Sequence, residues 1–125
     1  MNSRRPGIRA RLVYKITTAE QWARACRTGV FTGSPDDVRD GFIHLSEGAQ
    51  VAGTAARHFG RKDGLVLVAL DAEMLADGLK WEPSRSGELF PHYYGTLSVA
   101  AACWVRSLPL GPDGVPQVPG DLGPC

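Results

Sequence analysis

The sequence has few cysteines, no long apolar run and no marked excess of charge of one sign. Its three cysteines, Cys26, Cys103 and Cys125, are an odd number without paired spacing. Neither a disulfide framework nor a zinc knuckle is therefore predicted. Cys26 falls on a predicted helix face and Cys103 in an apolar run, so we expect both to be buried small hydrophobes. This pattern favours a protein of the reducing cytoplasm.

The apolar and charged residues exclude two kinds of partner. The longest apolar stretch, residues 99–105, is far shorter than the roughly 20 residues of a membrane span. No apolar segment of signal-peptide length follows the arginine-rich start. Fourteen basic and thirteen acidic residues leave a formal charge of +1, whereas nucleic-acid-binding proteins usually carry a strong basic field. We therefore expect neither a membrane nor a nucleic acid as partner.

Several motifs of known mechanism are also missing. The sequence contains no Walker A loop, no G-x-G-x-x-G, no H-E-x-x-H and no G-x-S-x-G. Its three histidines, His44, His58 and His92, lack local metal-ligand spacing. No metal site is predicted.

What is present indicates one α+β domain. With 43% hydrophobic residues among 125, the chain is able to build a single core. Strands and helices alternate at first, and strand and loop dominate later, which favours a mixed or antiparallel sheet with two main helices. The expected order is an extension at 1–11, then a domain at 12–110 with strand 12–17, a helix capped by Thr18 with Gln21 and ended by Gly29, loop 32–41, strand 42–46, helix 47–59 capped by Ser46, strand 65–70, short helix 72–77, strand 79–82, loop with some strand character 83–97 and strand 103–108, and finally a disordered tail at 111–125.

The same patterns predict which side chains form the core. In the strand around His44, alternation places Ile43 and Leu45 on one face and His44 and Ser46 on the other. The continuous apolar run at 65–70 is typical of a central strand covered on both faces. The side chains expected to be buried are Ile43, Leu45, Ala52, Ala55, Ala56, Phe59, Val66, Val68 and Trp104.

Polar residues of three segments, 34–46, 81–88 and 90–95, are predicted to line one ligand cleft. His44 and Ser46 would face it from a strand end, and Ser34 from the loop before. An imidazole in that position is able to titrate near neutrality or to bind a ligand. The alternative is a half-exposed histidine beside a serine that only caps a helix.

The two later segments carry further candidates. Glu82 is placed to act as a general base, and Arg85 to bind a phosphate or carboxylate through two parallel donors. His92, Tyr93 and Tyr94 suit a pocket that stacks a planar ligand and binds its edge. The alternatives are a surface ion pair between Glu82 and Arg85 and an ordinary core edge at the aromatic residues.

These segments resemble a known family. The runs Tyr14-Lys15-Ile16, Gly33-Ser34, residues 40–46 (DGFIHLS), residues 81–85 (WEPSR) and residues 90–95 (FPHYYG) are similar to the bacterial domain-of-unknown-function family 952. The resemblance covers residues 12–110. Members of that family resemble, distantly, the ADP-ribosylation fold of ADP-ribosyltransferases and RNA 2′-phosphotransferases.

The resemblance implies a split sheet that grips NAD or a related nucleotide. His44-Leu45-Ser46 is similar to the element that holds the adenosine ribose in those enzymes, and Tyr93 or Tyr94 would stack on nicotinamide. Glu82 and Glu88, the candidates for a catalytic glutamate, precede the aromatic segment, which departs from the order in those enzymes. The residue patterns and the resemblance together assign catalysis to His44 and Glu82 and ligand binding to Ser34, Ser46, Arg85, His92, Tyr93 and Tyr94.

Three functions remain open from the sequence. The first is an enzyme or binder acting on NAD, ADP-ribose or a similar ligand, for example a transferase of an ADP-ribosyl group. The second is a binding or regulatory module for another small phosphorylated or carboxylated metabolite. The third is a protein-interaction domain without a ligand.

Overall fold

A computed structural model of the chain describes residues 7–84 and 86–125. Its sheets have the strand orders β1-β4-β8, β2-β7 and β3-β6-β5, and every strand pair in the described residues is antiparallel. The α+β prediction is confirmed.

The strands are β1 Leu12–Thr18, β2 Val30–Phe31, β3 Ile43–His44, β4 Leu65–Asp71, β5 Leu79–Pro83, β6 Leu89–Tyr93, β7 Leu97–Ser98 and β8 Ala102–Leu108. The α-helices are α1 Ala19–Thr28, α2 Pro35–Asp40 and α3 Val51–His58. The 3₁₀ turns are η1 Gly48–Gln50, η2 Ala72–Gly78 and η3 Val99–Ala101.

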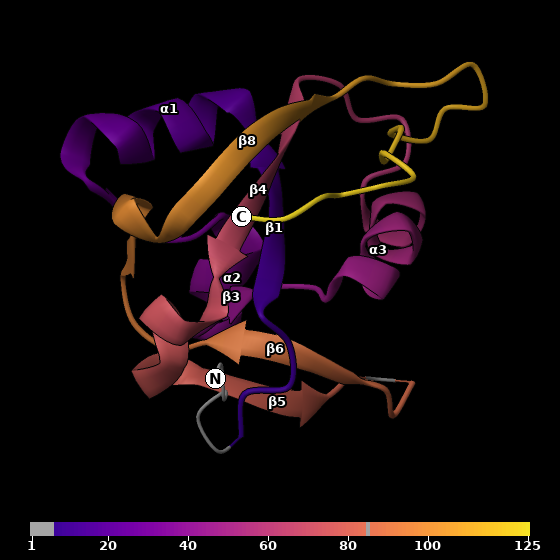
Figure 1. Cartoon of the computed structure of the whole chain (residues 1–125). Coiled ribbons are helices and arrows are strands. Elements are labelled where there is room, and N and C mark those ends of the chain that lie inside the picture. The colour runs from indigo at the N-terminus through magenta and orange to yellow at the C-terminus, as the bar shows by residue number, and fades with distance from the viewer. Residues whose placement is uncertain (1–6, 85) are drawn as a thin grey trace.

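Strand β4 lies at the centre of the largest sheet, with β1 and β8 on either side. Its alternate side chains enter two different cores because each face of the sheet is covered (Figure 1). Val66, Val68 and Leu70 join Trp22 of α1 in the first core. Leu65, Leu67 and Ala69 join Val51 and Ala55 of α3 in the second. The continuous apolar run at 65–70 therefore has the two-sided burial that the sequence predicted.

Helix α1 follows its sequence signals. The Thr18 side chain accepts from Gln21 N at 3.0 Å, and the Gln21 side chain accepts from Thr18 N at 3.4 Å, which forms the predicted capping box. Gly29 ends the helix with a φ of 90°, a conformation that glycine adopts without a Cβ penalty. Trp22 and Ala25 are buried, whereas Cys26 is exposed.

The smaller sheet β3-β6-β5 joins the larger one through one isolated bridge. Tyr14 N donates to Ser46 O at 2.8 Å, and Ser46 N donates to Tyr14 O at 2.9 Å. Strand β3 thus continues into a segment that pairs with β1, and the two sheets meet there. Residues at the end of β3 are therefore held between both sheets.

The segment after Gly33 differs from the loop that was predicted. Residues Pro35–Asp40 form α2, in which Ser34 N donates to the Asp37 carboxylate at 2.8 Å. Pro35 at the first helical position and Gly41 at the left-handed C-cap bound this short helix. Proline, aspartate and glycine are common in turns, but here they serve as helix start and stop signals.

The helix predicted at 47–59 starts later and has a different buried face. It begins with η1, and Glu47 rather than Ser46 is the N-cap, because the Gln50 side chain accepts from Glu47 N at 2.9 Å. Val51 and Ala55 are buried, Phe59 is partly buried, and Ala52 and Ala56 are exposed. The prediction for Ala55 was correct and those for Ala52 and Ala56 were wrong.

The cysteine predictions are overturned. Cys103 and Cys125 form a disulfide, with Cα atoms 4.9 Å apart, although 22 residues separate them in sequence. The sequence does not reveal that the chain folds back and brings these two residues together. The expectation of a reducing cytoplasm rested on unpaired cysteines and loses that support.

The C-terminal segment also departs from the disordered tail that was expected. Pro116 is fully buried, and Val118 and Leu122 pack against the second core beside the partly buried Trp104. Arg61 N donates to Gly114 O at 2.6 Å, which joins the segment to the turn after α3. In Figure 1 the segment, drawn in yellow, turns back toward the large sheet, and the C-terminus of the chain lies there.

None of the helices in the described residues has the length and apolar character that crossing a membrane requires.

Candidate functional site

The site is built around one buried carboxylate, Asp37 of α2. Its side chain is 2% exposed and contacts groups from two strands. Lys15 Nζ of β1 lies 3.0 Å from Oδ1 and 2.8 Å from Oδ2. His44 of β3 donates its backbone N–H to Oδ1 at 3.0 Å, and its ring Nδ1 lies 2.7 Å from the same oxygen. Asp37 therefore holds β1, α2 and β3 together.

The environment of Asp37 keeps it ionised. Burial acts to raise the pKa of this carboxyl, but the hydrogen bonds from His44 and the charge of Lys15 outweigh burial and hold the pKa well below its usual range. Burial lowers the pKa of Lys15, and the Asp37 carboxylate partly offsets that effect. Lys15 Nζ also donates to His44 O at 3.1 Å. The pair is a buried salt bridge with additional hydrogen bonds.

His44 lies between two carboxylates. Its Nδ1 faces Asp37, and its Nε2 lies 3.0 Å from Asp40 Oδ2 at the end of α2. Arg39 Nε lies 2.9 Å from the other oxygen of Asp40 and its NH1 lies 3.3 Å from Asp36. Both ring nitrogens of His44 therefore have an acceptor within hydrogen-bonding distance.

His92 lies directly across the strand pair from His44, and the two ring centroids are 5.9 Å apart. Its Nδ1 lies 2.8 Å from Glu82 Oε1 on β5. The Tyr94 hydroxyl donates to the same oxygen at 2.7 Å. The hydrogen bonds from Tyr94 and His92 lower the pKa of Glu82, and the bond to Glu82 raises the pKa of Tyr94.

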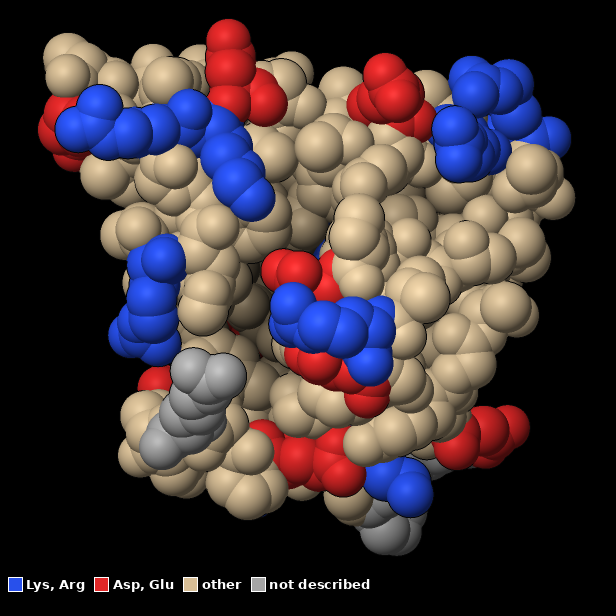
Figure 2. Space-filling model, turned by 180° about the vertical axis from the view of Figure 1, so that it is seen from behind, with Lys and Arg blue, Asp and Glu red and all other residues tan. Residues whose placement is uncertain are grey.

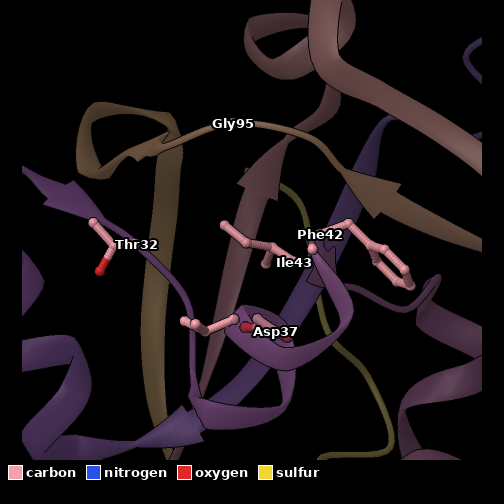
Figure 3. A pocket seen from close by; sticks show the side chains of 7 residues that line it. Thr32, Asp37, Phe42, Ile43 and Gly95 are labelled. Carbon is pink, nitrogen blue, oxygen red and sulfur yellow. The ribbon is translucent and has the colours of Figure 1, made fainter.

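Phe42 covers the faces of both histidine rings. Its ring stacks on His92 at a centroid distance of 4.0 Å and contacts His44 at 4.6 Å. In Figure 3 the Phe42 ring points away from Ile43, as strand alternation requires. Ile43 and Phe42 both line a small pocket of about 230 Å³ with Thr32 and Gly95, and Asp37 lines both this pocket and the larger cleft.

The two histidines open on a cleft of about 890 Å³. This volume lies within the range of small-molecule sites, roughly 300–1,000 Å³. Ser46 Oγ and Thr54 Oγ1, 3.2 Å apart, bring hydroxyls from the β3 end and α3. The lining side chains are Tyr14, Lys15, Ile16, Ser34, Asp36, Asp37, Arg39, Asp40, His44, Leu45, Ser46, Thr54, Arg57, His58, Phe59, Ser84, Ser86, Phe90 and His92.

Four of the eight predicted site residues meet at this cleft. Ser34, His44, Ser46 and His92 line it. Glu82 lies behind His92, and the 39% exposed Tyr94 lies beside Glu82. Tyr93 is different, because its ring packs against the first core and close to Gly78. Arg85 lies outside the described residues.

Sequence reasoning missed Lys15, Asp37 and Arg39, and it left Arg57 and His58 unassigned. One signal was available for Lys15, since a lysine stands in the middle of the apolar strand sequence LVYKIT. A charged residue at a buried strand position requires a partner, and Asp37 is that partner. Arg57 and His58 belong to the last turn of α3 and required the fold to be placed.

The charges of the cleft are mixed. Lys15 and Arg39 face the three aspartates, whereas Arg57 has no ion-pair or hydrogen-bond partner among the described residues. Figure 2 shows basic and acidic side chains interspersed over one face of the molecule. Among the described residues, no group of three or more His, Cys, Asp or Glu side chains is arranged to hold a metal ion.

These features define an α+β protein with a histidine-containing cleft between two antiparallel sheets. Residues 16–105 match the family "Protein of unknown function (DUF952)", and the chain belongs to this family. The family membership that the sequence motifs indicated is thereby confirmed.

Solved structures of a bacterial relative share the fold. The crystal structure of protein CC0527 from Caulobacter crescentus has 48% sequence identity and a TM-score of 0.81, covering 85% of this chain and 93% of the other. A double mutant of CC0527 gives 47% identity and the same TM-score and coverage. The solution structure of CC0527 gives 47% identity and a TM-score of 0.78, with 86% and 93% covered. Among curated proteins, none matches this chain significantly.

Proposed function

We propose that the cleft binds a small ligand that carries phosphate and ribose, of the class of NAD and ADP-ribose. The observation that supports this most is the collection, in one cleft of about 890 Å³, of three histidines, several hydroxyls and an arginine, Arg57, that has no partner among the described residues. Hydroxyls and imidazoles suit ribose, and a guanidinium suits phosphate.

Arg57 is the proposed phosphate contact. The acidic residues of the cleft are already engaged, because Asp37 pairs with Lys15 and Asp36 and Asp40 pair with Arg39. The guanidinium of Arg57, which has no partner in the described part of the chain, is therefore free to bind an anion. Arg85, predicted from the sequence for the same role, is outside the described residues.

The test is calorimetric titration with ADP-ribose and NAD. A charge-assisted hydrogen bond contributes about 1.5–3 kcal/mol, so Arg57→Ala should weaken binding by roughly 10- to 100-fold. Arg24→Ala is the matched control, since Arg24 is an exposed helical arginine on α1 that does not line the cleft. We expect this control to bind as the wild type does.

The second candidate is a site for another phosphorylated or carboxylated metabolite. Arg57, which has no partner among residues 7–84 and 86–125, favours any such anion, and none of the cleft contacts requires adenine. If neither NAD nor ADP-ribose gives heat of binding at millimolar concentration, the proposal of a site for ligands of this class is wrong. Heat with inorganic phosphate or citrate, lost in Arg57→Ala, would then support the metabolite site.

An enzymatic role is tested separately. If the ligand is NAD and an ADP-ribosyl group is transferred, nicotinamide is released and is measurable by chromatography. His92→Ala should abolish that release if His92, whose Nε2 has no partner in the described residues, holds the ribose. Binding of NAD without nicotinamide release would identify a binding module instead of a transferase.

A further inference from the structure

His44 and His92 have unlike hydrogen-bond surroundings, although they are paired across neighbouring strands. His44 meets a carboxylate at each ring nitrogen, Asp37 at Nδ1 and Asp40 at Nε2. A neutral imidazole has only one N–H, so it would leave one carboxylate facing a nitrogen lone pair. Only the imidazolium form donates to both.

His92 meets a carboxylate at one nitrogen only. Glu82 lies at Nδ1, and Nε2 has no hydrogen-bond partner in the described part of the chain. Every fully buried side-chain nitrogen or oxygen in the described residues has a hydrogen-bond partner. Since Nε2 of His92 has none there, this atom is accessible to solvent. His92 lines the cleft, so its open nitrogen faces that space.

More carboxylates surround His44 than surround His92. His44 lies between Asp37 and Asp40 of α2, of which Asp37 also binds the Lys15 ammonium and Asp40 also binds the Arg39 guanidinium. His92 faces Glu82 of β5, which also accepts from Tyr94, and the His44 ring 5.9 Å away. A cation at His44 disfavours a second cation at this distance. His44 is thus the site where the positive charge is held.

We propose that His44 is a fixed imidazolium and that His92 is a neutral imidazole whose Nε2 accepts a proton or hydrogen bond from a hydroxyl of the ligand. In a proton transfer, the ligand O–H bond breaks, an N–H bond forms at Nε2, and the oxygen keeps the electron pair. Glu82 is then a positioning residue, because its carboxylate holds the proton on Nδ1 and stabilises the cation that forms. The contact between His92 and a ligand hydroxyl rests on the proposed function, whereas the protonation states of the two histidines do not.

Nitrogen-15 NMR of the histidine rings in the unliganded protein at pH 7 tests the assignment directly. We expect both His44 nitrogens to be protonated, and His92 to be protonated at Nδ1 only. Glu82→Gln should shift the His92 proton partly to Nε2 and leave His44 unchanged. Tyr94→Phe removes the other donor to Glu82 and should leave the His92 tautomer as it is. A neutral His44, or a proton on Nε2 of wild-type His92, would overturn the proposal.

Chemical modification gives a second test with an unusual expectation. Diethylpyrocarbonate attacks only an imidazole nitrogen with a free lone pair. The His44 side chain is 38% exposed and the His92 side chain only 11%. Exposure alone therefore predicts faster modification of His44, whereas the proposal predicts modification of His92 and protection of His44. His58, which has no partner in the described residues, is the reactive control, and peptide mass mapping reads the result.

Faster modification of His44 than of His92 would contradict the proposal. Asp40→Asn gives a further comparison with the wild type. The substitution replaces the carboxylate at Nε2 of His44 and is expected to make His44 reactive. The contact between His92 and a ligand hydroxyl is tested with ADP-ribose. His92→Gln should weaken the binding of ADP-ribose about tenfold. If His92→Gln binds ADP-ribose as tightly as the wild type does, the proposed hydroxyl contact is wrong. If wild type does not bind at all, the proposed function fails while the protonation states stand.

Discussion

At the scale of the residue, Asp37 decides whether the site forms. It is buried and accepts from Lys15, from Ser34 N and from two nitrogens of His44. Its loss would leave the Lys15 ammonium, only 5% exposed, without a counter-charge. Breaking a buried pair by removing one partner costs much more than the net value of the pair, because the remaining charge is uncompensated.

Asp37→Asn should therefore lower the free energy of unfolding by roughly 3–5 kcal/mol, measured by urea denaturation at pH 7. Asp36→Asn is the matched control on the same helix. Asp36 is 73% exposed, so its change should stay within about 0.5 kcal/mol. Equal effects of the two substitutions would show that the buried pair does not stabilise the fold.

The same residue sets part of the pH dependence. The pKa of Asp37 is below its usual range in the folded protein, so its contribution is fully present above the unfolded value of about 4. It is lost as the pH falls below that value toward the folded one. The stability of Asp37→Asn should accordingly fall less steeply between about pH 5 and pH 2 than that of the wild type.

At the scale of the element, local signals predicted some structures and not others. Strand β1 and helix α1 were predicted because the apolar strand residues, the Thr18 cap and the Gly29 stop all lie within the segment itself. Alternation also placed Ile43 and Leu45 correctly in the core. Helix α2 was read as a loop because proline, aspartate and glycine signal both turns and helix ends.

The phase of α3 could not be read from its sequence. Alanines at 52, 55 and 56 give no strong preference for one face, and the helix contacts the second core through Val51 and Ala55. The site had the same limit. Lys15 and Asp37 are 22 residues apart, and their contact depends on how α2 docks beside β1 and β3. The sequence predicted His44 from local strand phase and His92 from its rigid aromatic segment, but it did not predict the ion pair that holds His44.

The observed phase of α3 predicts opposite outcomes for two alanines. Ala55 is fully buried in the second core, so Ala55→Leu should overpack it and lower the free energy of unfolding by roughly 1–3 kcal/mol. Ala52 is exposed, so Ala52→Leu should change it by less than about 0.5 kcal/mol. Thermal and urea denaturation of both variants measure the difference, and a larger loss at Ala52 would mean that the helix is turned the other way.

At the scale of the whole molecule, the C-terminal segment completes the second core. Helix α3 covers part of that face of the sheet, and Pro116, Val118 and Leu122 cover more of it. Leu122 reaches Gly48 next to Tyr14, and Tyr14 also lines the cleft. The segment therefore supports the elements that carry Thr54 and Arg57, although none of its own residues lines the cleft.

The disulfide fastens this segment to β8, which leads to a prediction for the whole chain. Closing a loop of 22 residues between Cys103 and Cys125 restricts the unfolded chain, and such cross-links stabilise by about 2–4 kcal/mol. Cys103→Ser should lower the free energy of unfolding by that amount, and reductant should do the same to the wild type. Cys26→Ser is the control, because Cys26 is free and exposed. If urea midpoints of Cys103→Ser and wild type coincide under oxidising conditions, the segment does not depend on its covalent link, and its packing against the second core alone holds it in place.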